Sequence, residues 1–387
     1  MPKTLHFFYL LLLIFAIPGC TKLQRITFNI KTTGIKNGVF IVKNDTGAMV
    51  FSANIKGGGV KIDSQVLEQT GYHILTITDD AHVLPSLNFE VYLDQGHYFI
   101  ELNKDDAGRY PKITSPSALQ RELSAYYTLA DSVLHARKKE SKDYNNQLHD
   151  KSSVLLPRDE YNALISNITL SAAKQQSAPV DALKEFISRY PKNTIAAHIM
   201  AGMPYEADAA AYYIIYKTMS DAAQNSDDGK VVGAKLSILI KLEPGRPAPG
   251  ISGSTPDGKP FYAANLRGRK IYLVEFWKSA SPQSRLNHEP PGLSNMLSGI
   301  TDKKDFGIIS ISLDHKRDWW TGAIADDKLD WPQQYSDLKG NESVNVQNWG
   351  ISLIPTYYLV DANWHIVDKD ILWQEIPVAV NQYLQHH

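Results

Sequence analysis

The chain has 387 residues, of which 43% are hydrophobic, and only one cysteine. This length suffices for two or three domains, each with a core of its own. The 40 lysines and arginines are balanced by 41 aspartates and glutamates. With no net basic charge and no dense run of basic residues, the sequence gives no support for nucleic-acid binding.

The N-terminus is predicted to be a targeting segment. Lys3 precedes an apolar run over residues 7–17, which ends in Ile17-Pro-Gly-Cys20. This run is too short to span a membrane. Ile-Pro-Gly-Cys resembles a bacterial lipobox, which implies that residues 1–19 are a lipoprotein signal peptide and that Cys20 carries diacylglycerol. Two acyl chains would anchor the protein stably. An ordinary signal peptide that contains a cysteine is the alternative.

Lipidation of Cys20 would remove the only thiol of the chain. An intramolecular disulfide, thiolate catalysis and a thiolate metal site would then be excluded. We expect no metal and no cofactor. We expect the protein in the bacterial cell envelope, attached through Cys20 to the outer membrane on its periplasmic or surface face.

Residues 20–112 are predicted to form a β-sandwich. Apolar residues alternate with polar ones in several short segments that are separated by turn sequences rich in glycine, asparagine and aspartate. The clearest alternating positions are Ile26, Phe28 and Ile30, then Val39 and Ile41, then Phe51, Ala53 and Ile55. Short strands at this spacing are typical of a sandwich.

Residues 113–242 are predicted to be a helical linker region. Apolar positions there recur at helical spacing, for example Leu119, Leu123, Tyr126 and Ala130, and later Leu183, Phe186, Ile187 and Tyr190. The expected fold class is therefore a multidomain α+β protein.

Residues 243–387 carry an ordered set of motifs. These are Arg246-Pro-Ala-Pro249, Asp257-Gly-Lys259, Asn265-Leu-Arg-Gly268, an apolar strand that runs into Phe276-Trp277, a second strand over 306–312, and Trp349 to Asp361 with Pro355 inside it. They resemble thioredoxin-like domains of the TlpA/ResA and AhpC/TSA type. The whole layout resembles the multidomain thiol–disulfide lipoproteins of Bacteroidota. The resemblance implies an α/β domain, a cis-proline at Pro355 and a buried acid at Glu275.

The sequence departs from this family at its redox centre. Ser281 and Ser284 stand where the family has its two cysteines, in the stretch Ser281-Pro-Gln-Ser284. Serine cannot form a disulfide, so thiol–disulfide exchange is predicted to be absent. Ser281 is a good N-cap and Pro282 suits the first helical position, so the stretch can still begin a helix. Glu275 is then either a relic or a structural hydrogen-bonding group.

Three functions are compatible with these residues. The leading one is a non-catalytic binding or scaffolding protein, in which an envelope protein or peptide lies in an apolar, uncharged groove. By the resemblance to thioredoxin-like domains, the groove would be formed by Trp277, Ser281, Pro282, Gln283, Ser284, Leu353, Ile354 and Pro355. Alternatively, Pro355 only shapes a buried turn.

The second function is that of the family, a thiol–disulfide oxidoreductase or peroxiredoxin-like protein of cell redox homeostasis. The third is a serine hydrolase, because Ser284 and His288 are four residues apart and would share a helix face. No oxyanion hole or third orienting group is marked in the sequence.

Overall fold

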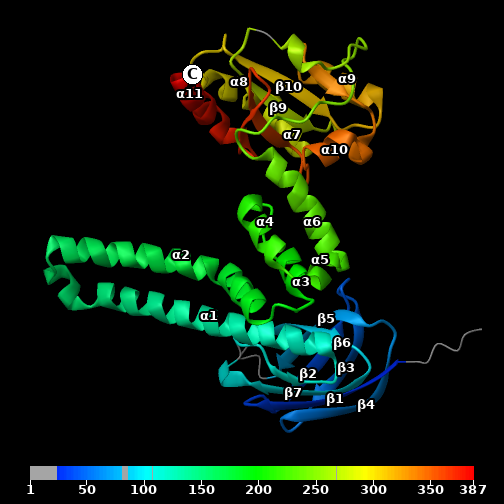
Figure 1. Cartoon of the computed structure of the whole chain (residues 1–387), viewed down its shortest axis with the longest axis vertical. Helices are drawn as coiled ribbons and strands as arrows, with labels where there is room; N and C mark the ends of the chain where they lie inside the picture. Colours follow the sequence, from blue (N-terminus) through cyan, green and yellow to red (C-terminus); the bar gives the residue numbers. More distant parts are fainter. Residues whose placement is uncertain (1–23, 81–85, 107, 267) are drawn as a thin grey trace, which may run out of the picture. The chain divides into compact units, whose positions relative to one another are not determined.

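The computed structural model describes residues 24–80, 86–106, 108–266 and 268–387 (Figure 1). Cys20 and the predicted lipobox lie outside these residues. The protein is a mixed α/β molecule with three sheets and a helical middle region in its described part. It divides into two compact units, Met1–Phe186 and Ile187–His387, which we describe separately.

The first unit contains two four-stranded sheets. One has the order β4-β1-β7-β8, formed by β4 (Gly59–Leu67), β1 (Gln24–Thr33), β7 (Gly96–Asn103) and β8 (Lys112–Thr114). The other has the order β3-β2-β5-β6, formed by β3 (Met49–Ile55), β2 (Gly38–Lys43), β5 (Gly71–Asp79) and β6 (Leu87–Leu93). The strands predicted from alternation are present.

A single hydrophobic core lies on the buried faces of both sheets. Successive strand residues point to opposite faces, so Ile26, Phe28 and Ile30 of β1 are buried together. The ring of Phe28 lies 5.4 Å from that of Phe40 on β2, which belongs to the other sheet. The alternating pattern thus brings residues of both sheets into one core cluster.

Two long helices, α1 (Ala118–His149) and α2 (Arg158–Arg189), follow the strands of both sheets in the chain. The side chain of Ser117 caps α1 by accepting a hydrogen bond from the Gln120 amide. Tyr127 of α1 stacks on Tyr110 at 4.7 Å, and its hydroxyl donates to Glu90 at 2.9 Å. The helices predicted from the spacing of apolar residues are therefore present.

The second unit begins with four short helices: α3 (Ala196–Ala201), α4 (Ala209–Thr218), α5 (Asp221–Asn225) and α6 (Asp227–Leu239). The predicted helical region is thus divided between the two units. Near the end of α6, Lys235 Nζ donates to the Gly350 carbonyl at 3.0 Å and to Ser352 Oγ at 2.6 Å. A Cβ on Gly350, whose φ is +61°, would lie 3.0 Å from Leu239 Cδ2, so this helix packs tightly on the loop.

A five-stranded sheet forms the centre of the second unit, in the order β11-β10-β9-β12-β13. Its strands are β9 (Ile271–Trp277), β10 (Phe306–Ser312), β11 (Gln334–Ser336), β12 (Thr356–Asp361) and β13 (Ile366–Lys369). The first three run parallel, whereas β12 is antiparallel to both β9 and β13.

Further helices of this unit are α7 (Pro282–His288), α8 (Gly292–Ser298), α9 (Arg317–Asp326), α10 (Val344–Asn348) and α11 (Ile376–His386). Every residue of β9 is buried, and its side chains enter two core clusters. Ile271 packs with Ile376 and Val380 of α11, whereas Trp277 packs with Trp320 and Ala323 of α9. Ile271 and Trp277 lie on the same face of β9; on the opposite face, the ring of Phe276 lies 5.2 Å from that of Trp349. The central strand is therefore covered on both faces, as its continuous apolar run indicates.

Candidate functional site

The stretch that replaces the two cysteines begins helix α7. Ser281 is the N-cap, and its Oγ accepts a hydrogen bond from the Ser284 amide at 3.2 Å. Pro282 occupies the first helical position, where its missing N–H is not needed. The predicted capping role of both residues is confirmed. Ser281 is half-buried, Pro282 and Gln283 are exposed, and Ser284 is buried.

Ser284 does not pair with His288. Its side chain is fully buried, and its hydroxyl makes no hydrogen bond within the described residues. His288 instead directs its two ring nitrogens at Glu275 and Asp327. The Ser284–His288 pairing that the third function requires is not observed, because both ring nitrogens of His288 face carboxylates. A serine hydrolase built on these two residues is not supported.

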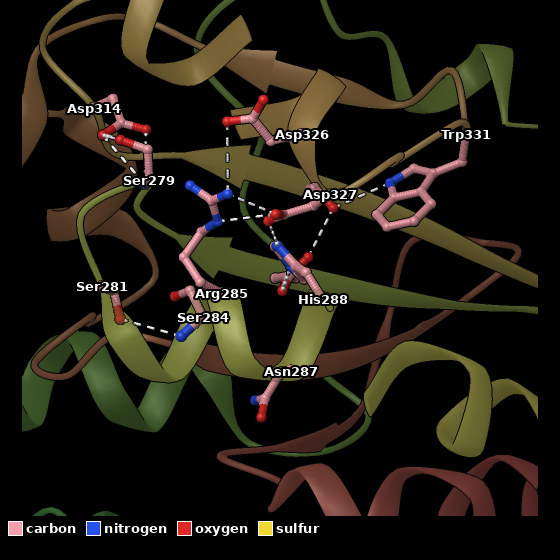
Figure 2. Close-up of polar contacts among 12 residues, drawn as sticks. Ser279, Ser281, Ser284, Arg285, Asn287, His288, Asp314, Asp326, Asp327 and Trp331 are labelled. Carbon is pink, nitrogen blue, oxygen red and sulfur yellow. Dashed lines mark hydrogen bonds and ion pairs between the residues drawn. The ribbon is translucent and has the colours of Figure 1, made fainter. Parts of the chain in front are cut away.

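Glu275 belongs to a buried polar network around His288. Figure 2 labels His288, Asp327 and Trp331 of this network. The Oε1 atom of Glu275 lies 2.7 Å from His288 Nε2, and its Oε2 accepts a hydrogen bond from Ser310 at 2.8 Å. Ser310 in turn accepts one from the Trp331 indole at 3.1 Å. Of the two roles predicted for Glu275, the structural hydrogen-bonding role is the one observed.

Asp327 closes the network on the other side of His288. Its Oδ2 lies 3.4 Å from His288 Nδ1, and its Oδ1 accepts two hydrogen bonds from Arg285, at 2.7 and 3.0 Å. Burial disfavours the charged imidazole, but attraction and hydrogen bonding by Glu275 and then Asp327 outweigh it and raise the pKa of His288. When His288 is protonated, it and Arg285 balance the charges of the two carboxylates.

Trp277 is a core residue. It is 0% exposed, and its ring meets that of His288 edge-on at 4.9 Å. The prediction that Trp277 lines a binding groove is therefore wrong. The physical reason is that β9 lies in the middle of a sheet with both faces covered, so no side chain of this strand reaches the surface.

The loop before β12 carries the cis-proline that the resemblance implied, since the Ile354–Pro355 peptide bond is cis. Thr356 Oγ1 donates to the Leu353 carbonyl at 2.6 Å and closes the turn. Leu353 is 77% exposed, and Ile354 and Pro355 are half-buried. The backbone N–H and C=O of Ile354 make no hydrogen bond with any described residue.

A cavity of about 630 Å³ lies beside Pro355. Its walls come from the turn between α3 and α4, from the end of α6, from α7, from the cis-proline loop and from the segment after β13. The lining residues are Glu206, Ala207, Leu239, Gln283, Asn287, Gly350, Ser352, Leu353, Ile354, Pro355, Thr356, Tyr357, Asp370, Ile371, Leu372, Trp373 and Gln374. Of the residues predicted for the groove, Gln283, Leu353, Ile354 and Pro355 line it. Ser281, Pro282 and Ser284 do not.

One wall of the cavity is polar and links α7 to β12. Gln283 donates to Asn287 Oδ1 at 2.8 Å, and Asn287 donates to the Tyr357 hydroxyl at 2.8 Å. Burial, and then the charge of Glu275, raise the pKa of Tyr357 well above its ordinary value, so this hydroxyl is neutral. Asn287 was missed from the sequence, although its position four residues after Gln283 places both on one helix face.

The cavity is not uncharged, contrary to the prediction. Glu206 and Asp370 both line it. Glu206 accepts a hydrogen bond from Ser352 at 2.9 Å and lies 3.4 Å from Lys235 Nζ. These acids come from segments on either side of the recognised motifs in the chain, and no local pattern marks them as site residues.

The described residues contain no group of three or more His, Cys, Asp or Glu side chains arranged to hold a metal ion. In the same part of the chain, none of the helices has the length and apolar character needed to cross a membrane.

Comparison with known proteins gives structural neighbours only. No protein family profile matches the chain, and no curated protein matches its sequence. The thioredoxin domain of a thiol-disulfide oxidoreductase from Bacteroides vulgatus is 27% identical, with a TM-score of 0.32, over 37% of this chain and 98% of its own. A thiol-disulfide oxidoreductase from Bacteroides fragilis is also 27% identical, with a TM-score of 0.30, over 36% of this chain and 98% of its own.

A longer similarity is to a thioredoxin-like protein from Bacteroides caccae. It covers 62% of this chain and 87% of that protein, at 16% identity and a TM-score of 0.41. These neighbours are of the class that the sequence motifs resemble.

Proposed function

We propose that this protein is a lipid-anchored, thioredoxin-like binding protein of the bacterial cell envelope that performs no thiol–disulfide chemistry. It holds an extended peptide segment of an envelope protein in the cavity beside Pro355. The two sheets of the first unit, with their common core, form a β-sandwich. The observation that carries the proposal is the open cavity of about 630 Å³ beside α7. This helix begins with Ser281 and Ser284 at the positions where the resembled family has its two cysteines.

Peptide binding is supported by the backbone at the cis-proline loop. The N–H and C=O of Ile354 have no partner among the described residues, and this residue lines the cavity. An extended peptide can satisfy both groups by main-chain pairing, as a strand added to a sheet edge does. The exposed side chain of Leu353 adds apolar contact area beside them.

Absence of redox chemistry is supported by the positions of the two serines. Ser281 and Ser284 serve the helix, by capping it and by filling a buried position, and neither hydroxyl can be oxidised to a disulfide. We therefore expect no activity in an insulin-reduction assay. Turnover in that assay would instead assign the protein to the oxidoreductase class of its family.

Site-specific photo-crosslinking in living cells tests peptide binding directly. We would place benzoylphenylalanine at Leu353, which is 77% exposed and lines the cavity, and as a matched control at Leu286, which is 64% exposed and lies on α7 outside it. The Leu353 probe should give discrete crosslinked envelope proteins, and the Leu286 probe should not. Adding Ile354→Arg should abolish the Leu353 products. Equal products at both positions would contradict a role for this cavity.

A further inference from the structure

Asp370 presents an unpaired carboxylate to the cavity beside Pro355. It lies just after β13, and within the described part of the chain it makes no hydrogen bond or ion pair. Burial raises the pKa of Asp370, and the neighbouring carboxylates of Glu206 and Asp368 raise it further, against the opposing effect of Lys369 and Lys235. A carboxylate in this position would gain from a cation placed next to it.

The nearby ammonium groups are already engaged. Lys369 Nζ lies 2.8 Å from Glu243, and Lys235 Nζ is shared between the Gly350 carbonyl, Ser352 and Glu206. The charged groups around Asp370 are therefore acidic in excess: Glu206, Glu243, Asp368 and Asp370 against Lys235 and Lys369. Among the described residues, no basic side chain forms an ion pair with Asp370, because Lys235 and Lys369 pair with other carboxylates.

The wall next to Asp370 is apolar and aromatic. Trp373 and Tyr357 are in ring contact at 5.2 Å, and Leu372 is 63% exposed although it lines the cavity. Arginine and lysine side chains combine a long aliphatic stem with a charged end, so they can lie along such a wall while the charge reaches a carboxylate. An aromatic face also attracts a cation directly.

We propose that the cavity selects an extended peptide segment with an arginine or lysine side chain, whose charged end pairs with Asp370. This inference rests on the proposed function, since it names the class of peptide that the cavity binds. Main-chain hydrogen bonds to Ile354 hold the peptide backbone in the cavity. The carboxylate of Asp370 makes binding selective for a peptide with a basic side chain. A purely apolar segment would leave the carboxylate unpaired in a partly desolvated position.

Binding of matched peptides to the detergent-solubilised full chain tests this inference. The probes are labelled eight-residue peptides of alternating Val and Thr in which one position, scanned along the peptide, is arginine, its neutral analogue citrulline, or glutamate. At low salt the best arginine peptide should bind about tenfold more tightly than the matching citrulline peptide, measured by fluorescence anisotropy. Raising the salt concentration should reduce this preference.

Two variants test whether Asp370 causes the preference for the arginine peptide over the citrulline peptide. Asp370→Asn should lower the affinity for the arginine peptide to that for citrulline and leave the citrulline affinity unchanged. Asn tolerates the left-handed backbone of this residue, whose φ is +53°, so the fold should be retained. Glu375→Gln removes a carboxylate from the same segment outside the cavity lining and should retain the preference.

The outcomes separate the two proposals. Equal affinities for all three peptides, or a preference that survives Asp370→Asn, would overturn the inference and leave peptide binding intact. Binding that survives Ile354→Arg would place the peptide elsewhere and overturn the inference as well. If no peptide binds at any position, both the inference and the proposed function are wrong.

Discussion

Ser281 and Ser284 lie in one helical turn, yet their hydroxyl groups are in opposite situations. The Ser281 hydroxyl caps α7, whereas the Ser284 hydroxyl is buried with no partner among the described residues. A cap stabilises a helix by satisfying one of its free N–H groups, but a buried polar group without a partner is unfavourable. The two positions therefore respond differently to the same substitution.

We expect Ser281→Ala to lower the free energy of unfolding by about 1 kcal/mol. Ser284→Ala should not lower it and should raise it by up to about 1 kcal/mol, because an unsatisfied hydroxyl is removed. Amide hydrogen exchange at the first turn of α7 measures the difference locally, which avoids the unfolding of the other unit. An equal loss of protection in both variants would mean that the Ser284 hydroxyl has a partner.

Residues could be predicted from the sequence where a local rule decides their role. Ser281 and Pro282 follow from capping preferences, and Glu275 and Pro355 from the family motifs. Trp277 was placed in the groove by the resemblance, but its burial depends on helices that follow later in the chain. Asp370 and Glu206 could not be predicted, because only the folded chain brings them to the same cavity.

At the scale of elements, His288 connects α7 to β9 and to the segment after α9. Its ring lies between Glu275 and Asp327, and Arg285 from the same helix binds Asp327. Because the pKa of His288 is raised in the folded protein, folding favours its protonated form. The resulting stabilisation is complete below the ordinary histidine pKa of about 6.5 and is lost as the pH rises through the higher folded value.

We therefore expect the free energy of unfolding of the second unit to fall as the pH is raised above about 6.5. His288→Gln should remove this part of the pH dependence. It should also lower stability by about 3 kcal/mol at pH 6, because two buried carboxylates lose their shared cation. Denaturation of wild type and variant at several pH values between 6 and 9 measures both effects.

The exposed residue His386, changed to glutamine, is the control and should leave the pH dependence as in the wild type. If wild type and His288→Gln lose stability in parallel as the pH rises, His288 is not the titrating group.

Single strands and helices could be predicted because the hydrophobic periodicity that identifies each one lies within its own sequence. Alternation in the first hundred residues and helical spacing after Ser117 each predicted the right kind of element. Their grouping was not predictable in the same way. The apolar stripe of a helix shows that a face is covered but not which neighbour covers it, so the pattern could not show that α6 packs on the loop before Pro355.

At the scale of the whole molecule, the proposed attachment to a membrane depends on Cys20, which lies outside the described residues. We expect the wild-type protein to incorporate labelled palmitate and to remain in the membrane pellet after an alkaline carbonate wash, since two acyl chains suffice for stable anchoring. Cys20→Ala should abolish the label and release the protein. A Cys20→Ala protein that stays in the washed pellet would contradict lipid anchoring at this residue.

Because α6 contacts the loop at Gly350, the chain from Glu243 to the C-terminus does not contain the complete cavity. Glu206, Ala207 and Leu239 supply one wall of the cavity, and all three precede the proline-rich segment at Glu243. A fragment cut at that segment would keep the whole five-stranded sheet but lose this wall. Transplanting the sheet and its own helices onto another protein would therefore transfer the scaffold without the complete pocket.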